Sequence, residues 1–249
     1  MTKRRTSSPK AAAAPSGENQ SMATVEDLRI LEKQHPDRAD VQFDLGVALA
    51  RQGEQGKAAK HWRKVVELDP AHSAARYFLG MYYLGQGKFR QAAEQYRQAL
   101  EHRPGDPYAH NNLGLVYARQ TQYGKAIECW EKALELSPEY SQAYYNLGLM
   151  YSRLGQLEQA ESYYLQALQL NADDVYAHNN LGQVYARQNR LDDAEGCFRR
   201  ALELDRTDLY AHNNLGKLME RTDRIDEARR EFELALQIDS GDAYARNNL

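Results

Sequence analysis

Apolar and small residues recur along most of the chain in a pattern that repeats every 34 residues. A Leu-Gly pair marks each copy, an Ala follows the Gly after twelve residues, and a large ring lies four residues beyond that Ala. With the pair at positions 7 and 8 of a unit, positions 4, 7, 8 and 11 have the spacing of an amphipathic helix, and so do positions 20, 24, 27 and 28. Each unit therefore predicts two helices.

This register divides most of the chain into six units. They are residues 39–72, 73–106, 107–140, 141–174, 175–208 and 209–242, and residues 243–249 begin a seventh. A polar break separates the two predicted helices, and a Pro ends the second helix of the first three units at Pro70, Pro104 and Pro138. Small residues at positions 8 and 20 let the helices approach at the short end of the ~8–10 Å range. The ring at position 24 is expected to fill the space between neighbouring hairpins.

The pattern resembles the tetratricopeptide repeat (TPR), and the resemblance covers roughly residues 37–249 in six in-register copies. It implies an all-α, right-handed solenoid of stacked antiparallel helix hairpins. It also implies a non-catalytic scaffold that binds an extended peptide or protein segment along the groove lined by the first helices. The copies depart from the pattern at position 32, where Ala172, Arg206 and Ser240 replace Pro in the later units.

The two ends of the chain differ from the repeated part. Residues 1–22 are rich in Ser, Ala, Pro and Gly and carry Lys3, Arg4, Arg5 and Lys10, which predicts a disordered basic tail. The tail is either a solubilising extension, which we favour, or a handle for an acidic partner. Residues 23–36 predict a helix that caps the first unit. Because the seventh copy stops at Leu249, we expect that the array is truncated there and that its open end permits self-association.

Candidate binding residues come from the face of the first helices that is opposite the core. At ~100° per residue, positions 2, 6, 9 and 13 share this face. Units three to six have Asn at position 6 and Arg at position 13, and three of them have Tyr at position 2. The predicted peptide-binding residues are Asn112, Asn146, Asn180, Asn214, Arg119, Arg153, Arg187, Arg221, Tyr108, Tyr176 and Tyr210. An Asn amide pairs with peptide backbone, an Arg fork with carboxylates, and a Tyr ring with amphipathic surfaces.

We call the Asn residues at position 6 the Asn ladder and the Arg residues at position 13 the Arg ladder. Two alternatives to peptide binding remain open for these ladders. Arg at position 13 and Asn at position 6 could instead join neighbouring hairpins, which would make the ladders structural. The Asn ladder also resembles the repeat region of O-linked N-acetylglucosamine transferase, so the chain could be a regulatory or substrate-recognition part of a larger enzyme that lacks its catalytic domain. The carboxylate clamp of chaperone-binding TPR proteins wants Lys at positions 2 and 5, and the chain does not have it.

Composition narrows the class of protein further. Hydrophobic residues make up 42% of the chain, charged residues 27%, and the formal net charge is −3, so binding of nucleic acid through overall charge is not expected. No apolar run approaches ~18 residues, so we expect no membrane span and a cytoplasmic location. Cys129 and Cys197 are two units apart, too far for a disulfide. His110, His178 and His212 share a core-side position, one per unit, and predict no metal site. We expect no cofactor and no enzymatic activity.

Overall fold

The computed structural model describes residues 24–249, which form fourteen helices and no strand. A capping helix α1 (Val25–Gln34) precedes the six units, and a short α14 (Ala243–Asn247) follows them. The first helices of the units are α2 (Ala39–Arg51), α4 (Ser73–Gly85), α6 (Pro107–Arg119), α8 (Ser141–Arg153), α10 (Val175–Arg187) and α12 (Leu209–Arg221). The second helices are α3 (Gln55–Leu68), α5 (Phe89–His102), α7 (Tyr123–Leu136), α9 (Leu157–Leu170), α11 (Leu191–Leu204) and α13 (Ile225–Ile238). The predicted tail, residues 1–22, lies outside the described residues.

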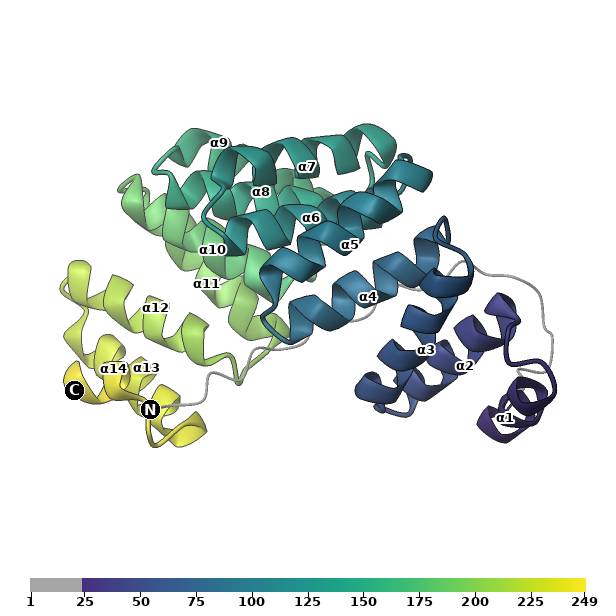
Figure 1. Ribbon diagram of the computed structural model, residues 1–249. Coiled ribbons are helices and arrows are strands. Elements are labelled where there is room, and N and C mark those ends of the chain that lie inside the picture. The colour runs from purple at the N-terminus through teal and green to yellow at the C-terminus, as the bar shows by residue number, and fades with distance from the viewer. Residues whose placement is uncertain (1–23) are drawn as a thin grey trace.

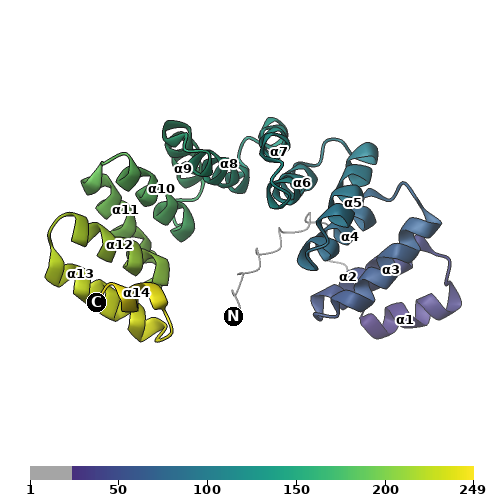
Figure 2. The ribbon, with the colours of Figure 1, turned by 60° about the vertical axis from the view of Figure 1, so that its left-hand side comes forward.

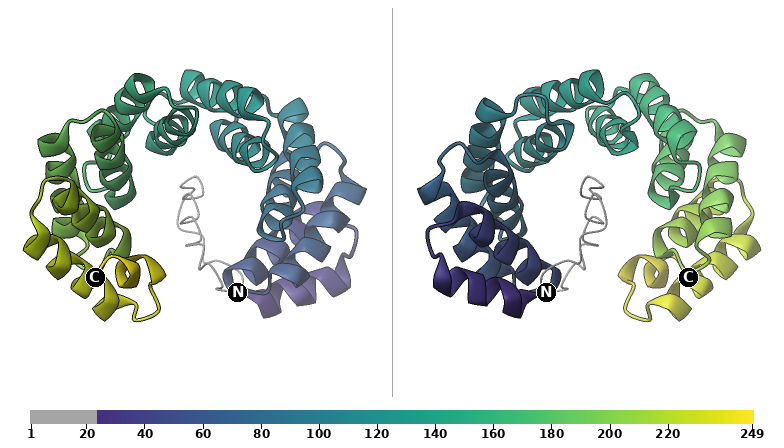
Figure 3. Two further views of the ribbon diagram at one scale, coloured as in Figure 1. Left: turned by 90° about the vertical axis from the view of Figure 1, so that its left-hand side faces the viewer. Right: turned by 90° about the vertical axis from the view of Figure 1, so that its right-hand side faces the viewer.

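The helix hairpins stack side by side into an open arc (Figures 1 and 3). Each second helix packs against the first helix of its own unit and against the first helix of the next. Consecutive first helices also contact one another, at α4–α6, α8–α10 and α10–α12. Figure 2 shows the first helices on the inner side of the arc. The predicted all-α stack of hairpins is confirmed, and its inner face is lined by the helices that carry the candidate residues.

The repeated Gly and the repeated ring form the core of each hairpin. A Cβ added to Gly46 would lie 2.5 Å from Trp62 Nε1, and in every unit the Gly at position 8 faces the ring at position 24 of the same hairpin at comparable distances. The missing Cβ is therefore what gives the ring its space. The ring also contacts the next unit, as where Trp62 stacks on Phe78 with ring centroids 5.0 Å apart and where Phe232 meets Tyr244 edge-on at 6.2 Å. It therefore packs within its own hairpin as well as between hairpins.

Position 15, between the two helices of each unit, has a positive φ in all six units. Three units have Gly there, at Gly53, Gly87 and Gly155. The other three adopt the same left-handed backbone with Thr121 at φ 62°, Asn189 at 62° and Asp223 at 60°. The turn is therefore set by the length of the unit, and Thr121 in particular adopts it against the preference of a β-branched residue.

The connections between hairpins keep their shape where Pro is missing. The second helices α9, α11 and α13 end at the same position of the unit as α3, which Pro70 follows. Asp side chains then begin most of the next first helices by accepting backbone N–H bonds, at Asp106, Asp174, Asp208 and Asp242. The three repeated His rings each hydrogen-bond the carbonyl at position 32 of the same loop, at 2.9 to 3.1 Å. Side chains therefore fix these loops without Pro.

Candidate functional site

The predicted Tyr residues at position 2 lie on exposed parts of the first helices. Tyr108 is 43% exposed, Tyr176 52% and Tyr210 68%. The ring of Tyr108 meets that of Tyr140 edge-on, with centroids 5.2 Å apart. The rings of Tyr176 and Tyr210 sit in the first turn of α10 and α12, next to the Asp residues that begin these helices. Three large amphipathic rings are thus available on this face for contact with another molecule.

Three of the four Asn residues at position 6 hydrogen-bond the preceding unit, whereas the fourth, Asn214, has a buried Nδ2 with no hydrogen-bond partner among the described residues. Asn112 Nδ2 donates to Tyr77 Oη at 3.0 Å, and Asn180 Nδ2 donates to Tyr145 Oη at 2.9 Å. Asn146, which is only 4% exposed, donates to Asn111 Oδ1 at 2.9 Å. Each of these bonds joins position 6 to position 5 of the previous first helix. The Asn ladder therefore links neighbouring hairpins, and any binding role uses the amide atoms that these bonds leave free.

The Tyr residues that accept these bonds stay neutral. Burial raises the pKa of Tyr77 to about 12, and the nearby Asp106 adds to this rise, against the smaller lowering effect of the bond from Asn112. Burial likewise raises the pKa of Tyr145 to about 12, with Asp174 contributing. A protonated hydroxyl in both places keeps these bonds between neutral groups over the physiological pH range.

A second set of contacts involves the Asn residues at position 5, which the sequence reasoning did not single out. Asn179 Nδ2 donates to Asp208 Oδ1 at 2.8 Å, and Asn213 Nδ2 donates to Asp242. The same Asp carboxylates begin the next first helices. The signal in the sequence is the pairing of Asn at position 5 with Asp at position 34, which recurs in the last two units.

The Arg residues at position 13 divide into two pairs. Arg187 Nη1 donates to the carbonyl of Ser152 at 2.8 Å, and Arg221 Nη1 donates to the carbonyl of Ala186 at 2.8 Å. These bonds satisfy the end of the preceding first helix. Arg119 and Arg153 are exposed and form no hydrogen bond or ion pair with any residue of the described range 24–249. The structural alternative thus describes Arg187 and Arg221, and the two central Arg residues remain available to a ligand.

Position 9 also belongs to this face and changes character along the chain. Met81 is 36% exposed, and Leu115 and Leu149 are half-buried. The corresponding residues of the last two units are the exposed Gln183 and Lys217. The sequence predicts that position 9 lies on the same face as positions 2, 6 and 13, but its apolar residues were not among the predicted binding residues. The signal in the sequence is the run of Met and Leu at this position in the second to fourth units.

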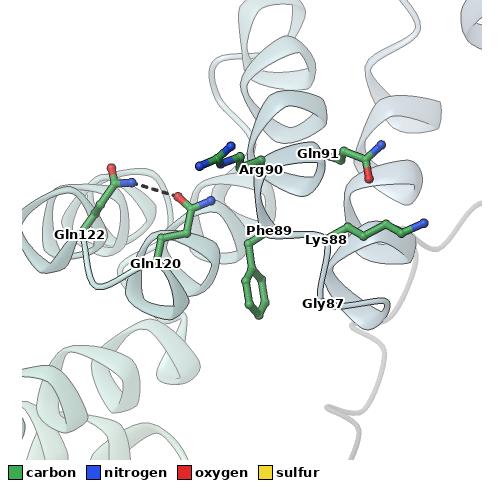
Figure 4. A pocket seen from close by; sticks show the side chains of 7 residues that line it. All are labelled: Gly87, Lys88, Phe89, Arg90, Gln91, Gln120 and Gln122. Carbon is green, nitrogen blue, oxygen red and sulfur yellow. Dashed lines mark hydrogen bonds between the residues drawn. The ribbon is translucent and has the colours of Figure 1, made fainter.

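Two pockets lie away from the Asn and Arg residues of positions 6 and 13. The larger one, about 610 Å³, is formed by the turn and first residues of α5 together with Gln120 and Gln122 of the next unit. Figure 4 shows its lining side chains and the 3.1 Å bond from Gln122 Nε2 to Gln120 Oε1. The other, about 320 Å³, lies beside the 2.7 Å contact between His212 and Glu231. Both are depressions at the junctions between units.

The remaining features to consider in the described residues are the two thiols, possible metal ligands and possible membrane-spanning helices. Burial raises the pKa of Cys129 and of Cys197 to about 11, so both thiols stay protonated. No group of three or more His, Cys, Asp or Glu within residues 24–249 is arranged to hold a metal ion. None of the helices in this range is both long and apolar enough to cross a membrane.

Comparison with known families agrees with the geometry. Residues 9–248 match the family model described as the Cilia and flagella-associated protein 70 C-terminal domain, a TPR family. The chain belongs to this TPR family. No curated protein sequence is significantly similar to it.

Solved structures share the fold of this TPR protein at low sequence identity. The APC/C hetero-tetramer Cut9-Hcn1 matches with a TM-score of 0.74 and 19% identity over 89% of this chain, which spans only 44% of that one. PilF of Pseudomonas aeruginosa matches with a TM-score of 0.74 and 20% identity over 86% of this chain and 97% of that one. YrrB, described as a TPR protein with an unusual peptide-binding site, has a TM-score of 0.62 and 24% identity over 76% of this chain and 97% of that one. These likenesses establish the fold.

Proposed function

We propose that this TPR protein is a non-catalytic scaffold that holds an extended segment of a partner protein along the inner face of the arc. The observation that carries the proposal is the exposure of Tyr108, Tyr176 and Tyr210 on the first helices. Large exposed rings without a core function mark interaction surfaces, because each ring offers apolar area and a hydroxyl at small entropic cost. The Asn amide atoms left free by the bonds between units would pair with the backbone of the segment.

The family supports this proposal. TPR arrays serve as protein-interaction scaffolds, and the structurally similar YrrB is described as having a peptide-binding site. In this chain several of the Arg and Asn residues at positions 13 and 6 already hydrogen-bond a neighbouring unit, so they have a structural role beside any role in binding. We therefore assign binding to the exposed Tyr rings, to the central Arg pair and to the free amide atoms. The enzyme-fragment alternative, a cytoplasmic location and self-association through the C-terminal end remain predictions.

A selection from a random peptide library on the full chain tests the proposal. Enriched peptides should lose most of their affinity for the Tyr176→Ala/Tyr210→Ala double variant, because the large rings make the contact, while its midpoint of thermal unfolding stays unchanged. The matched control is Leu165→Ala, which removes a similarly exposed side chain (46%) from the second helix α9. Affinity that survives the Tyr double variant but falls with the control would place the binding surface on the second helices.

A further inference from the structure

The two central Arg residues occupy an environment that their counterparts do not share. Arg187 and Arg221 are held by carbonyl groups of the preceding first helix, and Arg221 also donates to Asn189 Oδ1 at 3.1 Å. Arg119 and Arg153 have no such bond within the described residues. Arg119 and Arg153 are each the last residue of a helix, where the helix macrodipole favours a positive charge. This interaction leaves the N–H donors of each guanidinium group unbonded. Two guanidinium groups with their donors free therefore stand on consecutive units.

The charges around this pair do not neutralise it. The helices α6 and α8 contain no acidic residue, whereas α12 carries Glu220 directly before Arg221. An Asp begins α6, α10 and α12, but Tyr140 begins α8. Arg153 therefore lies on a first helix that contains no acidic residue and has no Asp cap, and Glu139, which precedes Tyr140, is at the opposite end of this helix from Arg153. The middle of the inner face therefore favours an anionic ligand.

Apolar side chains accompany the two cations. Leu115 lies four residues before Arg119, and Leu149 lies four residues before Arg153, so each pair shares one face of its helix. Both Leu side chains are half-buried. In the preceding unit Met81 continues the apolar row, and Gly85 replaces the Arg, with open space where a Cβ would be. We call Leu115, Arg119, Leu149 and Arg153 the central patch.

We propose that the central patch binds an extended peptide that carries two carboxylates three residues apart with apolar residues beside them. This rests on the proposed function and names the ligand chemistry of the same face. The 2.9 Å bond from Asn146 to Asn111 joins α8 to α6, and helices that pack side by side place equivalent side chains roughly 10 Å apart. In a polyproline II segment, residues i and i+3 point to the same side and lie about 9 Å apart. One carboxylate then meets each guanidinium, and the apolar neighbours cover Leu115 and Leu149.

Fluorescence anisotropy with defined peptides on the full chain tests the assignment. The probe is a labelled peptide with two Leu-Glu-Pro repeats closed by Leu, and its control has Gln in place of both Glu residues. We expect the Glu peptide to bind about tenfold more tightly or better, since each charge-assisted contact is worth on the order of one decade in affinity. Arg119→Gln/Arg153→Gln should abolish the difference and leave the affinity for the Gln peptide unchanged.

The matched control variant is Arg187→Gln/Arg221→Gln. It should lower the midpoint of thermal unfolding and preserve the preference for Glu over Gln. Equal affinity of the Glu and Gln peptides, or equal loss in the two double variants, would overturn the assignment. If the Glu preference is absent but library peptides still depend on Tyr176 and Tyr210, the inference fails and the proposed function stands. If binding is indifferent to all of these variants, both fail.

Discussion

The junctions among the first three units and those among the last three use different chemistry on the same backbone. At the first junction, Trp62 stacks on Phe78 of the next unit, and Phe43 lies 5.8 Å from the same ring. At the last junctions, Arg190 pairs with Glu161 at 2.7 Å and Arg224 pairs with Glu195 at 2.6 Å. Apolar burial is insensitive to salt, whereas partly exposed ion pairs are screened by it. The two halves of one array should therefore respond differently to the same solution.

Position 21 shows the origin of this difference. Ala59 and Ala93 are buried there in the first two units, whereas Glu161 and Glu195 occupy it in the fourth and fifth. An acid at position 21 gives the Arg at position 16 of the next unit a partner across the junction. Between the second and third units, Gln122 holds position 16 and its side chain donates to Gln120 Oε1 of its own unit, and the larger pocket lies beside it (Figure 4). An ionic junction therefore needs both an acid at position 21 and an Arg at position 16 of the next unit.

The largest expected effect is on the aromatic side of this comparison. Trp62→Ala should cost ~3–5 kcal/mol of unfolding free energy, because it removes a buried ring from its own hairpin and from the contact with Phe78. Urea unfolding in low and in high salt measures it, and the loss should be the same in both. Leu165→Ala is the surface control. A loss below about 1 kcal/mol would show that the aromatic junction contributes little.

The turn at position 15 offers a stabilising change. Thr121→Gly should raise the unfolding free energy by ~0.5–1 kcal/mol, since Gly adopts the left-handed backbone without the penalty of a β-branched side chain. Asn189→Gly is the matched control in the other half and should gain less, because Asn tolerates this conformation. Thermal unfolding of both variants checks the order. Destabilisation by the Thr121 change would indicate that its hydroxyl bond to the carbonyl of Gln120 matters more.

The ionic side should show a smaller and salt-dependent effect. Burial alone would raise the pKa of Glu195, but its bonds with Arg224 and Arg199 outweigh this and lower it. Glu195→Gln should cost ~0.5–1 kcal/mol at neutral pH and low salt, and almost nothing in about 1 M salt. The wild-type advantage should be complete above the unfolded pKa of Glu and should disappear as pH falls through the lowered pKa. Chemical unfolding at both salt concentrations and at acidic pH measures it; a loss independent of salt would contradict the ionic role.

The smallest expected effect is the pH dependence of stability that comes from two His residues, His61 in the first unit and His212 in the sixth. Burial lowers the pKa of His61, despite the attraction of Glu32. Burial opposes the charged form of His212 as well, but hydrogen bonds to Glu231 and to the Arg206 carbonyl raise its pKa. His212 therefore adds stability below its ordinary pKa of about 6.5 that is lost as pH rises through the raised value, and His61 removes stability as pH falls below about 6.5. Titration of the ring protons by NMR should give midpoints on opposite sides of 6.5, and midpoints on one side would refute this.

The sequence predicts the helices of this protein well, because the core of a hairpin depends on spacing within one unit. The Leu-Gly register places two helices in each unit on either side of a polar break, as α8 and α9 lie in the fourth unit. The partners of the ladders depend instead on how one unit docks on the next. The bond from Asn112 to Tyr77 joins residues 35 apart, and whether the acceptor is Tyr or Asn changes from unit to unit. The division between Arg119 and Arg187 is equally hidden, because both stand in the same Val-Tyr-Ala-Arg-Gln segment and yet only Arg187 donates to a carbonyl of the preceding first helix.

The Asp residues that begin α12 and α14 have a mechanical consequence. Asp208 both starts α12 and accepts a bond from Asn179 of α10, the preceding first helix, so the last two units cannot separate without loosening a helix start. At α8 this coupling is missing, because Tyr140 begins the helix and no described side chain caps it. A stack of coils under tension extends first where adjacent coils are least coupled. Pulled by its ends, the array should act as a spring whose last two junctions are stiffer than the junction between its third and fourth units, beside the central patch.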